Sequence, residues 1–335
     1  MKKAIVVGFL FFIYSCLPYE EDDSWNSYNY STNLYVYDIE SHQKSKIEID
    51  STAAINNYNI SSNGKTIIYT TNEKTVFYDM ETGAEIQILD WYSQHFSISP
   101  SGNQFAHIAK SEGRAQIFIF SLISQEWTMA TSDSLDKWNV RFASETTIYF
   151  LSGTSDIYKL NLSNDTITPI IHGNSRPIHF FWISSTETLI YKTYKSYISE
   201  DVFRYTLLQD SAVWIASTSN LFNLEFFAEN DSILFDMMSG SERDVFTMSV
   251  NGGEKIKWTD DASADYDPSI SSSGQYIVYQ TVIEGENSTL TLINKTTKEV
   301  VTIEDAFESR GWVETPRFIP NTNKIIYMKS TADEE

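Results

Sequence analysis

Seven mostly polar residues stand about twelve positions before the ends of a repeated apolar segment. These residue types hydrogen-bond sugars and peptides, particularly beside aromatic rings. If the fold brings them together, they form a binding site; the alternative is that each only caps a turn, as Asp and Asn often do. The set consists of Asn57, His95, Trp138 or Asn139 (the latter if the turn is one residue shorter), His179, Asn223, Asp267 and Thr315, with Trp91, Tyr92, Trp182, Tyr266 and Trp312 nearby.

The sequence has no recognisable catalytic or metal-binding motif. His95, His179 and Asp267 have metal-binding side chains, but no His-x-His or Glu-x-x-His spacing accompanies them. The acidic run from Asp260 to Asp267 lacks a twelve-residue calcium loop. No Gly-x-Ser-x-Gly occurs, so a serine hydrolase is not indicated. We therefore predict no cofactor and no metal, and we keep as an alternative a carbohydrate-active hydrolase or lyase that uses two carboxylates.

The elements that would position these residues form one repeated pattern. Residues 60–69 (ISSNGKTIIY), 98–107 (ISPSGNQFAH) and 270–279 (ISSSGQYIVY) align without a gap. Weaker copies end at Phe150, Tyr191, Phe235 and Tyr327, so successive copies lie 38 to 48 residues apart. The copies are rich in Ile, Val, Thr, Tyr and Phe, and Gly, Asn and Ser stand at their turns, which predicts β-strands. This period is the size of a four-stranded propeller blade.

The two ends of the repeated region complement each other. Residues 34–38 and 46–49 resemble the third and fourth strands of a copy, whereas residues 316–329 supply only the first and second. Joining them into one blade closes a ring and leaves no open sheet edge. Six full copies and this composite predict an all-β, seven-bladed β-propeller over residues 34–330. Six or eight blades would require a misread copy, most readily at residues 192–222.

The repeats resemble the TolB-type β-propeller family. The best match, residues 241–280, contains Asn251-Gly252-Gly253, the pair Trp258-Thr259, Asp267-Pro268 and the turn 271–274, and residues 99–102 (SPSG) come nearest to the family's Ser-Pro-Asp-Gly. The resemblance implies the fold. It also implies a protein that binds proteins, peptides or sugars, or an accessory domain of a peptidase.

The N-terminus has the features of an export signal. Lys2 and Lys3 precede an uncharged apolar run that is too short to span a bilayer as a helix. The run ends in Ile13-Tyr14-Ser15-Cys16, which resembles the lipobox of bacterial lipoproteins and contains the only Cys of the chain. We expect a signal peptide at 1–15, acylation of Cys16, an acidic tether at 16–33 and a tail at 331–335. The alternative is an ordinary signal peptide with an incidental Cys.

The chain is strongly acidic. Its 45 Asp and Glu residues outnumber 24 Lys and Arg residues and give a formal net charge of -21. Nucleic-acid binding through phosphates requires the opposite balance, so no nucleic-acid partner is expected. The leading hypothesis is a non-enzymatic scaffold in the bacterial cell envelope. It would be attached to the outer membrane only through its lipid, on the periplasmic or the surface-exposed side, and would bind a protein, peptide or glycan.

Overall fold

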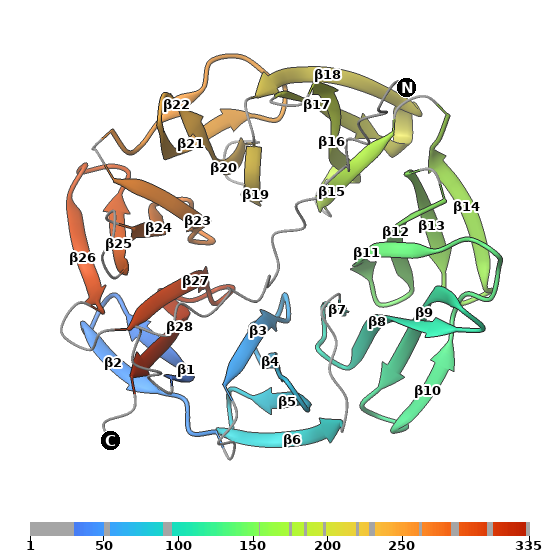
Figure 1. Cartoon of the computed structure of the whole chain (residues 1–335), viewed down its shortest axis with the longest axis horizontal. Coiled ribbons are helices and arrows are strands. Elements are labelled where there is room, and N and C mark those ends of the chain that lie inside the picture. Colours follow the sequence, from blue (N-terminus) through green and yellow to red (C-terminus); the bar gives the residue numbers. More distant parts are fainter. Residues whose placement is uncertain are drawn as a thin grey trace, which may run out of the picture.

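A computed structural model describes residues 30–49, 54–89, 96–153, 155–173, 176–183, 186–196, 199–218, 221–227, 232–260, 263–282, 288–306 and 311–332. Within these residues, seven four-stranded antiparallel sheets stand side by side in a ring (Figure 1). The fold is therefore a seven-bladed β-propeller, as the repeats predict. Among the described residues, no helix has the length and apolar character needed to cross a membrane.

Six blades are each made of four consecutive strands, the first of which lies innermost. Blade one is β3 (Ile55–Ile60), β4 (Thr66–Thr71), β5 (Thr75–Asp79) and β6 (Ala84–Leu89). Blade two is β7 (Phe96–Ile98), β8 (Gln104–Ser111), β9 (Arg114–Ser121) and β10 (Glu126–Met129). Blade three is β11 (Lys137–Ser144), β12 (Thr147–Ser152), β13 (Asp156–Asn161) and β14 (Thr166–Ile171). Blade four is β15 (Pro177–Ile183), β16 (Thr188–Ser196), β17 (Ser199–Thr206) and β18 (Ser211–Thr218), with a short 3₁₀ turn, η2 (Leu207–Gln209), before its last strand. Blade five is β19 (Leu221–Phe227), β20 (Ser232–Ser239), β21 (Glu242–Ser249) and β22 (Ile256–Lys257), and blade six is β23 (Ala264–Ile270), β24 (Tyr276–Val282), β25 (Ser288–Asn294) and β26 (Val300–Asp305).

The seventh blade joins the two ends of the described chain. Its strands occur in the order β27 (Trp312–Phe318), β28 (Lys324–Ala332), β1 (Tyr30–Asp38) and β2 (Gln43–Lys46). β1 pairs antiparallel with β28 from Tyr30 opposite Ala332 to Asp38 opposite Lys324. The predicted composite blade is thereby confirmed. Its two central strands are longer than expected, because β1 begins four residues before position 34 and β28 ends two residues after position 330.

The repeated aromatic at the end of each sequence copy lies in the core. Tyr69, Phe150, Phe235 and Tyr327 are all less than 1% exposed, at the centre of the second strand of their blades. Each of the seven apolar clusters fills the space between sheets, as in the cluster that joins Leu34 and Ile326 of the closing blade to Ile67 of blade one. The sequence repeats because every blade presents the same faces to its neighbours.

The Ser-x-x-Gly segment of the strongest copies forms the turn between first and second strands. The Gly102 N–H donates to the Ser99 carbonyl at 2.9 Å, and the Ser99 hydroxyl accepts the Gln104 N–H at 3.2 Å. Gly102 has a φ of +81°, and a Cβ built on it would lie 2.8 Å from the Thr66 Cβ of blade one. This glycine is therefore required both by its backbone conformation and by the close approach of the neighbouring blade.

Candidate functional site

The polar residues singled out in the sequence lie in the innermost strands, around the axis of the ring (Figure 1). Each is the third or fourth residue of its strand, at or beside an irregularity in its pairing with the second strand. We call the five whose side chains are described the axial ring: Asn57, Asn139, His179, Asp267 and Thr315. The backbone of Asn223 occupies the same place in β19, where side chains are not described. His95, Trp91 and Tyr92 lie outside the described residues.

Three axial-ring residues have a left-handed backbone within a β-bulge. Asn139, Asp267 and Thr315 have φ angles of +51°, +50° and +49°. Asn and Asp tolerate this conformation better than most residues, which gives a structural reason for their recurrence. A bulge also re-aims the side chains that follow it, and bulges are frequent beside functional sites. The residue types at Asn139 and Asp267 therefore have a backbone cause, and the bulge places the next residues of the strand as well.

Two arginines follow the bulges at the same register in different blades. Arg141 comes two residues after Asn139 in β11, and Arg317 comes two residues after Thr315 in β27. These strands lie on opposite sides of the axis (Figure 1). Burial, together with the positive charge of Arg317, lowers the pKa of Arg141, so the two charges interact across the axis. The sequence analysis did not single out either arginine, because the second position after the ring residue is Arg in these two blades only.

His179 lies beside these cations. It pairs in register with Lys192 of β16, which forms an ion pair of 3.1 Å with Glu200. Burial lowers the pKa of His179 to about 3, and the positive charges of Arg141 and Lys192 act in the same direction. The imidazole is therefore neutral at pH 7 and is able both to donate and to accept a hydrogen bond.

Carboxylates gather on blades five to seven. Burial raises the pKa of Asp236 in β20 to about 7; its ion pair with Arg243 opposes this shift, and the charge of Asp267 adds to it. Burial, followed by the charge of Asp267, also raises the pKa of Glu314 in β27. Asp267 and Glu314 therefore bring two interacting carboxyl groups to the first strands of blades six and seven, and Asp236 lies buried near Asp267.

The predicted aromatic residues differ in how much of each ring is available. Trp182 packs in the core between blades three and four, with its ring centroid 4.9 Å from that of Tyr149. The Arg243 guanidinium covers Tyr266 at 4.5 Å from the ring centroid. Trp312, at the start of β27, is 42% exposed. Trp182 therefore packs against the core between two blades, because alternation along β15 turns its side chain toward the neighbouring blade.

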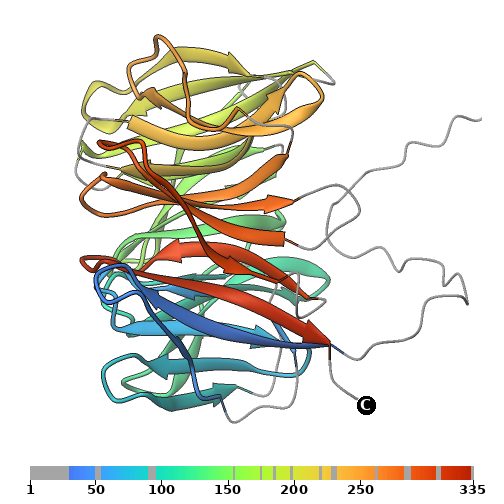
Figure 2. The same ribbon diagram turned by 90° about the vertical axis from the view of Figure 1, so that its left-hand side faces the viewer.

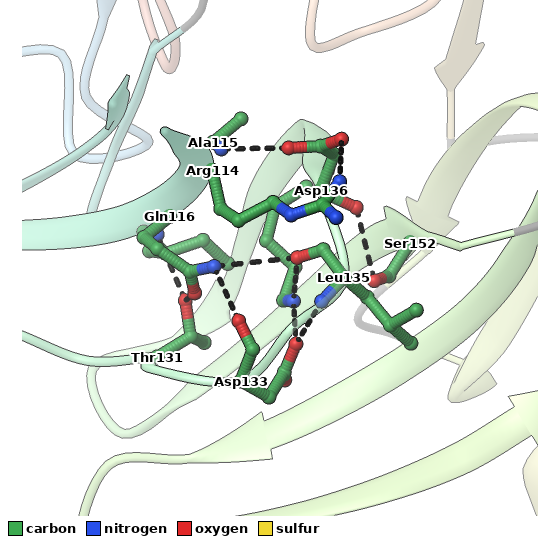
Figure 3. Close-up of polar contacts among 10 residues, drawn as sticks. Arg114, Ala115, Gln116, Thr131, Asp133, Leu135, Asp136 and Ser152 are labelled. Atoms are coloured by element: carbon green, nitrogen blue, oxygen red, sulfur yellow. Dashed lines mark hydrogen bonds and ion pairs between the residues drawn. The ribbon is translucent and has the colours of Figure 1, made fainter. Parts of the chain in front are cut away.

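The loop before β11 shows how these strands are held in place (Figure 3). The Gln116 side chain donates to the Asp133 and Leu135 carbonyls at 2.8 and 3.3 Å. Asp136 accepts the Ala115 N–H at 2.8 Å. These bonds join the loop to β9 of the preceding blade. The start of β11, and with it Asn139 and Arg141, is therefore fixed by hydrogen bonds between blades.

A threonine two residues after the fourth strand makes the same contact in two blades. The Thr131 hydroxyl accepts the Ile117 N–H at 2.9 Å, and the Thr259 hydroxyl accepts the Val245 N–H at 3.0 Å. Thr259 is the second residue of the pair Trp258-Thr259 in the TolB-type resemblance. Beyond the end of β22, the Thr259 hydroxyl takes the place of a backbone carbonyl as the hydrogen-bond acceptor for the Val245 N–H.

Two carboxylates of the acidic run at 260–267 have partners within the protein. Asp260 forms an ion pair with Lys257, and Asp265 accepts a hydrogen bond from the Thr281 hydroxyl at 2.8 Å. Among the residues that the structure describes, no group of three or more His, Cys, Asp or Glu side chains is arranged to hold a metal ion.

Comparisons with known proteins recover the fold and do not assign a family. No family model and no curated protein matches the sequence. A protein described as a TolB from Agrobacterium tumefaciens is 13% identical, with 91% of this chain and 100% of that one covered and a TM-score of 0.56. An oligogalacturonate lyase from Vibrio parahaemolyticus is 11% identical, with 82% of this chain and 84% of that one covered and a TM-score of 0.64. Dipeptidyl peptidase 4 from Porphyromonas gingivalis is 12% identical, with 85% of this chain and 50% of that one covered and a TM-score of 0.57. At such identities the likeness concerns architecture alone. The chain therefore has a TolB-like β-propeller fold, one that also occurs in a lyase and a peptidase.

Proposed function

We propose that the protein is a binding scaffold that holds a peptide segment of a partner protein at the axial ring. The observation that carries this proposal is that first strands around one axis carry both cations and carboxyl groups. Arg141 and Arg317 supply cations, Asp267 and Glu314 supply carboxylates, and neutral His179 supplies a donor and an acceptor. A peptide offers groups complementary to all three kinds.

The state of the aromatic residues favours a peptide over a glycan. Sugar rings bind largely by stacking on open aromatic faces. Of the described aromatics predicted for this purpose, Trp182 is packed on Tyr149 and Tyr266 is covered by Arg243. Trp312 alone among them retains a large exposed area. Charged and amide groups therefore dominate what the axial ring offers to a ligand.

Affinity capture tests the proposal. The full-length chain, solubilised from membranes, is the bait, and mass spectrometry identifies what it retains. Replacing Asp267, His179 and Trp312 together (Asp267→Asn, His179→Gln, Trp312→Ala) is expected to abolish retention of the partner. The control is Trp214→Ala on outer strand β18, where the side chain is 55% exposed. Undiminished capture by the triple variant would exclude the axial ring as the binding surface.

We further propose that Cys16 is acylated and attaches the scaffold to a bacterial envelope membrane. Tyr30 pairs with Ala332, and Trp312 at the start of β27 pairs with Ser330, so both ends of the described chain leave from the face where the first strands begin. In Figure 2 the C-terminal end of β28 emerges at this face. The 14 residue steps from Cys16 to Tyr30 reach at most about 50 Å when fully extended. Metabolic labelling with an alkyne fatty acid is expected to mark the wild type and not Cys16→Ser.

A carbohydrate-active enzyme is the alternative, and one observation favours it. Glu314 has a raised pKa and lies beside the charge of Asp267, and glycosidases use two carboxyl groups with unequal proton affinity. The test is to incubate the protein with neutral and acidic oligosaccharides and to measure new reducing ends and unsaturated products. Turnover that is lost in Glu314→Gln would replace the scaffold proposal.

A further inference from the structure

The same three-residue arrangement occurs in two blades on opposite sides of the axis. Asn139-Val140-Arg141 in β11 and Thr315-Pro316-Arg317 in β27 each consist of a left-handed polar residue, a buried apolar residue and an arginine. Each triplet spans a register shift between the first and second strands of its blade. The matching backbone places equivalent side chains of blades three and seven at one level of the axis.

Both triplets also contain a buried polar atom without a hydrogen-bond partner. The Asn139 amide nitrogen and the Thr315 hydroxyl are inaccessible to solvent, and neither finds a partner among the described residues. Burying a polar group without a hydrogen-bond partner is unfavourable, so each such group calls for an explanation, and a role in binding a ligand is one. Both of these groups are able to donate a hydrogen bond.

The contacts of Arg141 leave its charge without a carboxylate in the described part of the chain. The described contacts of its Nη1 are the Phe96 and Val140 carbonyls, each at 3.5 Å. These are long for hydrogen bonds, and the Arg317 charge repels that of Arg141. Two like charges that repel each other at half-buried positions favour the binding of an anion between them.

We propose that Arg141, Arg317, Asn139 and Thr315 bind the free carboxylate at the C-terminus of the peptide ligand. This inference rests on the proposed function and names the part of the ligand that the axial ring recognises. Guanidinium groups bind carboxylates through strong, charge-assisted hydrogen bonds, and the two neutral donors add to these. The ligand carboxylate also screens the repulsion between the two arginines.

The neighbouring carboxylates restrict the anion to a single charge. Glu314 lies three residues before Arg317 in the same strand, and Asp267 interacts electrostatically with Glu314. A phosphate dianion at the arginine pair meets more repulsion from these groups than a carboxylate does. A cationic residue of the same peptide is attracted to them, so the ligand is expected to carry a positive side chain near its terminal carboxylate.

Two synthetic peptides test the assignment on the full-length protein. The probes are acetyl-Ala-Lys-Ala with a free C-terminus and the same peptide with a C-terminal amide, and isothermal titration calorimetry measures their binding. We expect the free acid to bind about tenfold to hundredfold more tightly, as for the loss of one charge-assisted contact. Arg141→Gln and Arg317→Gln are expected to lose this preference. Arg204→Gln, on the third strand of blade four, is expected to keep it.

A second measurement separates ligand binding from a structural role. Without peptide, Arg141→Gln is expected to unfold at the same or a higher denaturant concentration than the wild type, because one of two repelling charges is gone. Equal binding of acid and amide, retention of the preference in both arginine variants, or marked destabilisation without ligand would each overturn the proposal. Binding of galacturonate with neither peptide bound would reassign the anion to a sugar acid.

These outcomes are distinguishable from failure of the scaffold proposal. In one outcome, the triple variant at Asp267, His179 and Trp312 loses capture of the partner while Arg141→Gln and Arg317→Gln still capture it. In that case the axial ring binds a partner and the carboxylate assignment is wrong. If no variant changes capture, the scaffold proposal itself fails.

Discussion

The phenol of Tyr58, in the first strand of blade one, donates a hydrogen bond to the Ile326 carbonyl of the closing blade at 3.0 Å. The same phenol contacts the carbonyl of Thr315, the left-handed residue of the β27 bulge. One buried side chain thus joins the first complete blade to the composite one and fixes the bulge from which Arg317 extends.

Tyr58→Phe is expected to destabilise the protein by about 1–2 kcal/mol, because it leaves buried carbonyl groups with fewer donors. The denaturant midpoint followed by tryptophan fluorescence measures this effect. Tyr194→Phe, at a side chain that is 71% exposed, serves as the control and is expected to have a negligible effect. Equal effects of the two substitutions would show that the Tyr58 hydroxyl does not join the blades.

Gly102→Ala is expected to be far more destabilising than Gly113→Ala. The two glycines have nearly the same φ, +81° and +80°, so an added methyl group meets the same backbone penalty at each position. A Cβ at Gly113 has no atom within 4 Å, whereas at Gly102 it would collide with Thr66 of the neighbouring blade. We expect about 1 kcal/mol for Gly113→Ala and several times that for Gly102→Ala.

Thermal unfolding of the two glycine variants in parallel checks this difference. Similar melting temperatures would mean that the turn does not approach blade one as closely as described.

The sequence predicts the blades better than the site for a physical reason. The buried aromatic residues at the centre of the second strands, such as Tyr69 and Tyr327, recur because every blade packs in the same way, and this repetition is visible without structure. The direction of a side chain near a bulge depends on pairing register, which one sequence does not show. The packing of Trp182 against Tyr149 and the place of Arg141 beyond the β11 bulge therefore come from the structure, whereas the places of Asn139 and His179 in first strands follow from the repeat.

His179 is expected to make the protein less stable in acid. The unfolded state takes up a proton at this residue with a pKa near 6.5, whereas the folded state does so only near pH 3. Lowering the pH from 7 toward 3 therefore favours unfolding. In His179→Gln, the fall in unfolding free energy between pH 6.5 and 4.5 is expected to be smaller than in the wild type by about 2–3 kcal/mol.

Urea titrations at several pH values measure this slope. His172→Gln, at an exposed residue of the loop after β14, is the matched control and is expected to leave the slope unchanged. Asp236 acts in the opposite direction: with a folded pKa of about 7, it makes stability fall as pH rises from about 4 to 7. A wild-type slope that the His179 substitution does not alter would rule out this source of acid sensitivity.

A disulfide between the ends of the ring tests its closure directly. The hydroxyls of Thr32 in β1 and Ser330 in β28 lie 2.8 Å apart as a cross-strand pair. In a Cys16→Ser background, Thr32→Cys with Ser330→Cys is expected to oxidise to a bridge that encloses 299 residues. The chain-entropy relation sets an upper limit of about 5–6 kcal/mol on the stabilisation.

The control bridge is Ser196→Cys with Ser199→Cys, a cross-strand pair within blade four whose hydroxyls are 2.9 Å apart. It encloses four residues, for which the same relation allows only about 2 kcal/mol. Denaturant midpoints with and without reductant compare the two. A larger gain for the 32–330 bridge, reversed by reductant, is expected because only that bridge holds the closing blade together when the ring opens. If the cysteines at 32 and 330 did not oxidise while those at 196 and 199 did, the pairing of β1 with β28 would be contradicted.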